Sequence, residues 1–506
     1  DSSTSRGLGD VYKRQTLYTK LVYTQFKITI YSGAPLTGRQ QNLYPHRKDK
    51  CIVTHNMDRA VKNIKEMEEM GIRRLLWKYF LPAFTGVLVN ALYNIVDRIF
   101  IGRGVDALAL SGLSAVFPLM LIIFAFAMLV AIGANVRISI NMGKRDYKRA
   151  EWVLGNAVTL GIIISILLTL FGYIYRYPLL KIFGEGEGAM PYALEYFEYI
   201  LFANIFANIG FILNNACRAE GNPKTAMYSL FISAGTNTVL DPIFIFGFGM
   251  GVKGAAIATI ISQFVLCIWV VAHFYSKRST LKLHFSNLRL NSHIIYNIIT
   301  IGFAPFSMQM AASAVQAVLN TQLIRYGGEL AVGAMGIINS VGQLLVMSII
   351  AINMASQPII GFNFGAEQYK RVKETLLICI YAATFISFGG FALTQLLPGE
   401  IVRIFNTNNP ELFELGRKGL RIFTLFFPVV GFQIIIGSYY QSIGKAGIAA
   451  FLSLLRQVII LIPILYLLPR FYHLDGVWFA NPISDLLAGA ISSIFLIKAL
   501  KKLNKA

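Results

Sequence analysis

Long apolar stretches follow one another along most of the chain, separated by short polar segments. From about residue 75 onward each stretch could cross the roughly 30 Å hydrocarbon core of a bilayer, which takes about 20 helical residues. The pattern predicts about twelve transmembrane helices, at residues 76–102, 109–137, 152–174, 191–215, 224–247, 252–275, 295–324, 331–357, 374–396, 411–440, 448–469 and 475–499. We therefore expect an all-α polytopic membrane protein.

The first half of this pattern recurs in the second half. Asn141, Gly143 and Tyr147 recur 222 residues later as Asn363, Gly365 and Tyr369. The same offset, within one residue, relates Pro82 to Pro305, Ile182-Phe183 to Ile404-Phe405, Gly221 to Gly444, Ala258 to Ala480 and Ser262 to Ser484. Six spans per half is an even number, so the halves insert with the same orientation around an axis along the membrane normal. We expect two homologous six-helix lobes with a central cleft, where secondary transporters usually bind substrate.

Domain boundaries follow from the repeat. Residues 57–275 would form the N-lobe, 276–294 a cytoplasmic linker between the lobes, and 295–506 the C-lobe. Residues 1–56 are polar and basic and contain no apolar core of a secretory signal. We expect them to be a non-native or disordered extension ahead of Met57.

Composition agrees with a membrane protein. Hydrophobic residues make up 55 % of the chain and charged residues 14 %, with a mean hydropathy of +0.58, outside the range of soluble domains. The formal charge of +21 could indicate a nucleic-acid partner, but Lys and Arg lie in short loops between apolar runs, so we expect none. They gather in alternate loops, such as 144–149 and 277–289, which predicts a plasma-membrane protein with both termini in the cytoplasm.

An acidic residue, Asp97, interrupts the first predicted span. A charge at the bilayer centre costs roughly 3 kcal/mol, so an intramembrane acid is a functional-site candidate. On a helix, Tyr93 and Asn90 lie on the same face as Asp97. The alternative is a helix-end residue paired with Arg98, but adjacent helix positions point about 100° apart. Pro82, near the start of the span, predicts a bend.

A second acidic residue, Asp241, lies in the fifth span. Asn237 precedes it by four residues and shares its helix face. Pro242 cannot donate a hydrogen bond to the carbonyl of Thr238, which frees a backbone oxygen beside both side chains. This group of oxygens suits a hard cation, or a proton held on a buried carboxyl. The alternative is that Asp241 caps a new helix that begins at Pro242, although the remaining helix would be too short to span.

Other polar residues are less specific. The fourth span carries a line of amides that could be helix-packing contacts or part of a polar network: Asn204, Asn208, Asn214 and Asn215. The sequence contains no Walker lysine that would indicate an ATPase. It also shows no arrangement of His, Ser and metal ligands that would indicate a membrane-embedded enzyme, and we expect no cofactor. The four cysteines lack the spacing of a disulfide framework or a zinc site.

Four motifs together resemble the multidrug and toxic compound extrusion (MATE) transporters, within the branch of MepA-like and DinF-like exporters. They are residues 94–102, 217–227, 237–246 and 251–259, and the likeness extends from about Gly71 to the end of the chain. The resemblance implies a monomeric antiporter that uses a Na⁺ or H⁺ gradient to export amphipathic, often cationic drugs by alternating access. A flippase for lipid-linked oligosaccharides, of the same superfold, is the alternative.

The resemblance also implies roles for single residues. It implies a cation site, for Na⁺ or H⁺, formed by Asp97, Asn237, Asp241 and Thr259. It implies that Tyr93 and Asn214 belong to a polar network around that site, and that the helix bends at Pro82. From their positions in the sequence we expect Asn90 and Asn208 to join this network. The seventh span lacks the acid that another branch uses in its C-lobe, and Asn320 stands at the repeat position of Asp97. The resemblance therefore does not extend to a C-lobe cation site.

Overall fold

The computed structural model divides the chain into two units, Asp1–Asn56 and Met57–Ala506. It describes residues 64–104, 107–182, 190–405 and 409–505, and within these it leaves out the side chains at 94–95, 97–99, 101–112, 114–115 and 505. The expectation for residues 1–56 lies outside the described residues. All that follows concerns the second unit.

The described part of the first half consists of helices joined by short turns. They are α3 (Ile72–Gly104), α4 (Ala107–Gly143), α5 (Tyr147–Ile174), α6 (Arg176–Ile182), α7 (Met190–Ala219), α8 (Pro223–Pro242), the π-helix η2 (Ile243–Gly247) and α9 (Gly251–Tyr275). A short 3₁₀ helix, η3 (Phe285–Leu288), lies in the segment that leads to the second half.

The second half repeats this arrangement with more interruptions. Its helices are α10 (Ser292–Gly365), α11 (Tyr369–Leu396), α12 (Pro398–Phe405), α13 (Pro410–Phe423), α14 (Phe427–Ser442), α15 (Ala446–Leu454), the π-helix η4 (Leu455–Leu461), α16 (Ile462–Leu467) and α17 (Pro469–Lys505). No strand occurs in the described ranges, so the all-α prediction is confirmed.

The predicted spans are also confirmed, with one difference in how they divide. Ten described helices are long and apolar enough to cross a membrane, or eleven when α13 and α14, bent by 50°, count as one span. One of them, α10, has 74 residues, far more than a single crossing needs. Its backbone turns back at Gly328, where φ is +67° and only glycine is comfortable. Counting the two arms of α10 separately gives the twelve predicted spans.

The two halves meet along helices that the sequence repeat relates to each other. Asn135 on α4 donates a buried hydrogen bond of 2.8 Å to Gln357 on α10, and these positions are 222 residues apart. A Cβ at Gly143 would lie 1.9 Å from the carbonyl oxygen of Phe362, and one at Gly365 would lie 2.1 Å from that of Ile140. Each motif glycine therefore packs against the counterpart of its own neighbour, as expected where a pseudo-twofold axis passes between α4 and α10.

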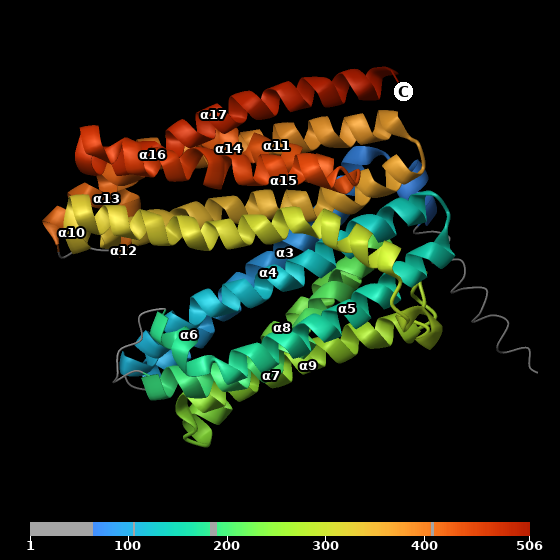
Figure 1. Ribbon diagram of the computed structural model, residues 1–506, viewed down its shortest axis with the longest axis horizontal. Helices are drawn as coiled ribbons and strands as arrows, with labels where there is room; N and C mark the ends of the chain where they lie inside the picture. Colours follow the sequence, from blue (N-terminus) through green and yellow to red (C-terminus); the bar gives the residue numbers. More distant parts are fainter. Residues whose placement is uncertain (1–63, 105–106, 183–189, 406–408, 506) are drawn as a thin grey trace, which may run out of the picture. The chain divides into compact units, whose positions relative to one another are not determined.

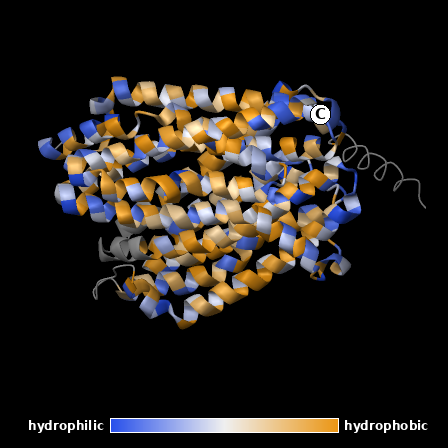
Figure 2. Cartoon of the chain, turned by 45° about the horizontal axis from the view of Figure 1, so that its top comes forward, coloured by the Kyte–Doolittle hydropathy of each residue, from blue (hydrophilic) through white to orange (hydrophobic). Residues whose placement is uncertain are grey.

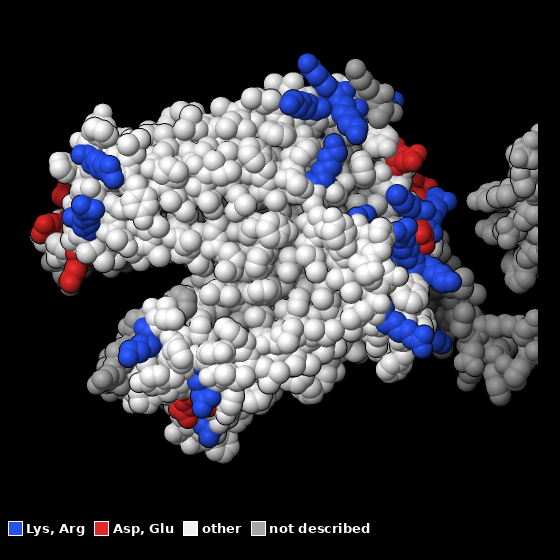
Figure 3. Space-filling model, in the orientation of Figure 1, with Lys and Arg blue, Asp and Glu red and all other residues white. Residues whose placement is uncertain are grey.

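At one end of the contact between α4 and α10 the two halves share one hydrophobic core, and at the other end each half has its own. The largest cluster joins both halves and contains Ile138 and Phe362. Beyond it, one cluster around Phe197 belongs to the first half and another around Trp478 to the second. Figure 1 shows α6–α9 and α10–α17 diverging in this direction, and Figure 3 shows the surface hollowed between them, at the end away from most Lys and Arg residues. The predicted central cleft is therefore present within this unit.

The surface has the distribution expected for a lipid-facing bundle. Hydrophobic residues cover the lengths of the helices, and hydrophilic ones lie mainly near their ends (Figure 2). Large apolar side chains such as Leu167, Phe385 and Leu396 are exposed to between 60 and 78 %. In a soluble protein such exposed apolar side chains would favour aggregation, whereas in a membrane they contact lipid hydrocarbon.

The predicted linker between the lobes is shorter in the structure, since α10 begins at Ser292, and it comprises residues 276–291. Buried side chains hold this linker to the first half. Glu220, in the turn between α7 and α8, accepts hydrogen bonds from Ser279 Oγ at 2.6 Å and from the N–H groups of Thr280 and Leu281 at 3.1 and 3.2 Å. Its other oxygen lies 2.5 Å from Nε2 of His273 on α9. The linker is thus a fixed part of the N-lobe surface.

Candidate functional site

Asp241 lies inside a continuous helical segment. The backbone of α8 continues through Pro242 into η2, with αR dihedral angles at Pro242 and at Ile243. The alternative that Asp241 caps a new helix is therefore wrong. Counted along α8 from Pro223, Asp241 is about 27 Å from the start of the helix, so it lies toward the end where the cleft opens. Its side chain is completely buried.

The structure brings Asn237 and Thr259 together with Asp241. The Nδ2 of Asn237 donates to Asp241 Oδ1 at 3.2 Å and to Thr259 Oγ1, on α9, at 3.5 Å. The Oδ1 of Asn237 is buried and has no hydrogen-bond partner among the described residues. A buried acceptor of this kind costs about 1–3 kcal/mol unless another group satisfies it. The donor set of carboxylate, amide and hydroxyl oxygens therefore fits a hard cation.

The side chain of Asp97 lies outside the described residues, but its place in α3 is described. Phe100, one turn further along α3, packs edge-on against Phe246 of η2, with ring centroids 6.2 Å apart. This segment of α3 therefore runs beside the end of the helix that carries Asp241. On the same helix Tyr93 is half-buried and Asn90 is exposed.

Asn208 and Asn214 make their hydrogen bonds elsewhere in the lobe. Asn208 donates to Ser165 Oγ of α5 at 2.7 Å, and Asn214 donates to Ser229 Oγ in the first turns of α8 at 2.7 Å. Ser229 is about 18 Å along α8 from Asp241, so Asn214 does not reach that carboxyl. These two amides join helix to helix, as the packing alternative for the fourth span implied.

Pro82 lies inside α3, whose helical residues continue on both sides of it. Pro82 leaves the carbonyl oxygen of Lys78 without a helical donor. One turn further along, the hydroxyl of Thr85 donates to the carbonyl of Leu81 at 2.8 Å. The bend predicted at this position remains a prediction.

The C-lobe contains a buried acid that the sequence did not suggest. Asp485 on α17 is buried, and its Oδ1 lies 2.6 Å from Nε of Arg456 in η4. At the repeat position of Asp97, Asn320 accepts a hydrogen bond of 3.0 Å from Gln316. The C-lobe carboxyl is thus paired with an internal guanidinium. In the described residues no three His, Cys, Asp or Glu side chains gather as transition-metal ligands would.

Comparison with known proteins identifies a transporter family. The MatE family model matches residues 82–243 and 305–467, one match in each half. The multidrug export protein MepA of Staphylococcus haemolyticus (strain JCSC1435) is 24 % identical over 434 residues, which cover 86 % of this chain and 95 % of that protein. MepA of Staphylococcus aureus (strain NCTC 8325 / PS 47) shows the same identity and coverage.

Solved structures share the fold. A MOP superfamily transporter from Pyrococcus furiosus superposes with a TM-score of 0.82 at 22 % identity, over 87 % of this chain and 98 % of that one. A structure described as MATE in the bent conformation gives a TM-score of 0.82 at 23 % identity, over 88 % of this chain and 98 % of that one.

Proposed function

Because the chain belongs to the MatE family, we propose that it is a cation-coupled antiporter that exports amphipathic, cationic compounds across the plasma membrane. The names of the MepA relatives support multidrug export as the activity. The cleft between the two halves supports alternating access, since it offers a path to one side of the membrane at a time.

The observation that carries the proposal is the buried carboxyl of Asp241 with Asn237 and Thr259 beside it. In this proposal Asp241 supplies the negative charge that attracts the coupling cation, and Asn237 and Thr259 supply neutral oxygens. Both oxygens would serve either ion, as ligands of Na⁺ or as acceptors for the O–H group of protonated Asp241. Asp97 would complete the site from α3. Coupling requires that the cation bind one conformation of the cleft more tightly than the other.

The distribution of charge supports an orientation. Lys and Arg gather at the end where α4 meets α5 and where α17 ends (Figure 3). By the positive-inside tendency this end would face the cytoplasm, with both termini there. The cleft would then open outward, and Asp241, toward the same end, would take its cation from outside.

The test is efflux of an ethidium-like dye from cells or everted vesicles, driven by an imposed Na⁺ or H⁺ gradient. Asp241→Asn removes the charge and keeps the shape, and we expect gradient-dependent efflux to fall at least about tenfold with the protein still present in the membrane. Asp97→Asn should do the same. Asp475→Asn is the matched control, because Asp475 is a partly exposed acid paired with Lys418. Full dye export by either site variant would reject the proposed cation site.

A further inference from the structure

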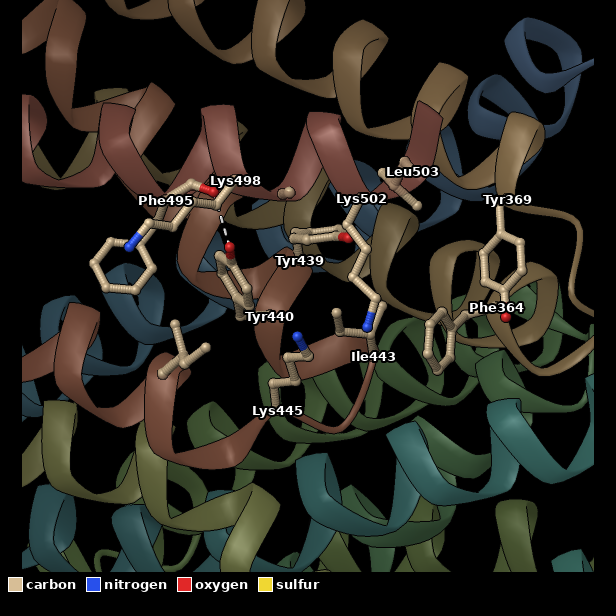
Figure 4. Close-up of a pocket in the computed structure, with 12 residues that line it drawn as sticks. Phe364, Tyr369, Tyr439, Tyr440, Ile443, Lys445, Phe495, Lys498, Lys502 and Leu503 are labelled. Atoms are coloured by element: carbon tan, nitrogen blue, oxygen red, sulfur yellow. Dashed lines mark hydrogen bonds between the residues drawn. The ribbon is translucent and has the colours of Figure 1, made fainter. Parts of the chain in front are cut away.

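A cavity apart from the candidate cation site lies at the end of the C-lobe where α17 terminates. Its volume is about 390 Å³. Three parts of the lobe enclose it: the turn from α10 to α11, the turn from α14 to α15, and the last turns of α17. Figure 4 shows the residues around it.

The cavity is basic. Lys445, Lys498 and Lys502 line it, and no acidic residue does. None of the three forms an ion pair with an acid among the residues that the structure describes. Figure 4 shows the ammonium groups of Lys445 and Lys502 pointing into the same space from opposite walls. That of Lys498 lies 5.7 Å from the ring centre of Phe495, at the rim. Such like charges are stabilised by an anion placed between them.

The walls are built from tyrosines whose positions are fixed. The hydroxyl of Tyr440 donates to the carbonyl oxygen of Phe495 at 2.8 Å, which joins α14 to α17. Tyr439 packs edge-on against Tyr440, with ring centroids 5.2 Å apart. Within the described part of the chain, the Tyr439 hydroxyl makes no hydrogen bond to another residue, so it is available as a donor to a ligand.

An apolar surface continues from the cavity along the helices. Phe451 of α15, whose ring centre is 6.0 Å from that of Phe495, is 41 % exposed. Ile494 and Ile497 of α17 are exposed to 53 and 54 %. Lysine and tyrosine at a helix end, followed by exposed apolar side chains, mark the level where headgroups give way to hydrocarbon. A ligand with an anionic head and apolar tails would match both parts.

We propose that this cavity binds the phosphate headgroup of an anionic phospholipid, with the acyl chains along α15 and α17. Lys445 and Lys502 hold the phosphate by charge, Lys498 covers it at the rim, and the Tyr439 hydroxyl is positioned to donate a hydrogen bond. Basic pockets between transmembrane helices are suited to such headgroups. The bound lipid would link the three parts of the C-lobe that enclose the cavity.

The test is native mass spectrometry of the purified full-length protein with added phosphatidylglycerol, phosphatidylcholine or inorganic phosphate. We expect the wild type to retain phosphatidylglycerol in preference to phosphatidylcholine. The double variant Lys445→Gln/Lys502→Gln should bind it about 30-fold more weakly, from the loss of two charges near the headgroup. Lys501→Gln is the matched control, because Lys501 is exposed on the same helix but does not line the cavity.

A second variant separates charge from folding. Lys445→Arg/Lys502→Arg keeps both positive charges and should retain the lipid. If the Arg and Gln variants lose it equally, or if the Gln variant binds as Lys501→Gln does, the proposal is wrong. It is also wrong if phosphatidylcholine binds as tightly, or if millimolar inorganic phosphate alone displaces the lipid completely, since the site would then serve a free anion.

Discussion

At the scale of single residues, the candidate cation site depends on few atoms. Asn237 bridges the carboxyl of Asp241 and the hydroxyl of Thr259, so one amide links α8 to α9 at this point. The Oδ1 atom of Asn237 is a buried acceptor with no hydrogen-bond partner among the described residues. In the proposed cation site, Thr259 contributes its hydroxyl oxygen and not its size.

Thr259→Val replaces that hydroxyl by a methyl group. If Thr259 Oγ1 is a ligand of the coupling cation, half-maximal efflux should require about tenfold more cation, the equivalent of one hydrogen bond to a charged group. Thr259→Ser, which keeps the oxygen, should remain close to wild type. The measurement is the cation dependence of dye efflux in proteoliposomes, and an unchanged dependence in the Val variant would remove Thr259 from the site.

The sequence predicted contacts within one helix but missed contacts between elements far apart in the chain. Asn237 and Asp241 are four residues apart on one helix, so helical geometry alone brings them together. Thr259 lies on the next helix and was found only through the family resemblance. The partners of Asp485 and Glu220 could not be predicted from spacing, because Arg456 is 29 positions away and the linker about 60.

At the scale of helices, α4 of the first half packs closely against both arms of α10. On the first arm of α10, Gly302 faces α4 at Gly133, and hypothetical Cβ atoms at Gly133 and Gly302 would lie 2.1 and 1.7 Å from the carbonyl oxygens of Ile298 and Leu129. Small residues allow this approach where dispersion, rather than water exclusion, drives association. The sequence repeat predicted two lobes, but the glycine contacts between them depend on how the lobes dock.

Gly365→Ala tests this crossing. The added methyl would lie 2.1 Å from the backbone oxygen of Ile140, which cannot move aside as a side chain could, so we expect a destabilisation of about 1–3 kcal/mol. Gly389→Ala is the control, because it lies in α11 with no atom within 4 Å of the new methyl and should gain helix stability. Thermal unfolding of the purified proteins compares them, and equal melting temperatures would contradict the close crossing.

At the scale of the whole unit, the linker carries the chain from one lobe to the other while bound to the first. Glu220 receives hydrogen bonds from three groups of the linker and contacts His273 on α9. Asn156 on α5 adds a further attachment, since its Oδ1 accepts from the N–H of Asn291 at 2.7 Å. These contacts attach both ends of the linker to the first half.

Glu220→Gln should loosen this attachment. An amide in place of the carboxylate loses the negative charge and presents an N–H₂ group among backbone donors, which leaves buried groups unsatisfied. We expect faster trypsin cleavage at Lys277 and Arg278, both exposed on the linker. The control is Glu367→Gln, a change at an exposed turn of the other lobe. A cleavage rate equal to that of the control would show that Glu220 does not hold the linker.

Gly143 contacts the backbone of Phe362, and Gly365 contacts that of Ile140. Substitutions at the two glycines are therefore physically coupled across the repeats. A methyl group added to either glycine would collide with a backbone oxygen of the other repeat, so a larger residue at one position requires the backbone of the other repeat to shift. At positions 97 and 320, in contrast, the two repeats carry different residues, an acid and an amide.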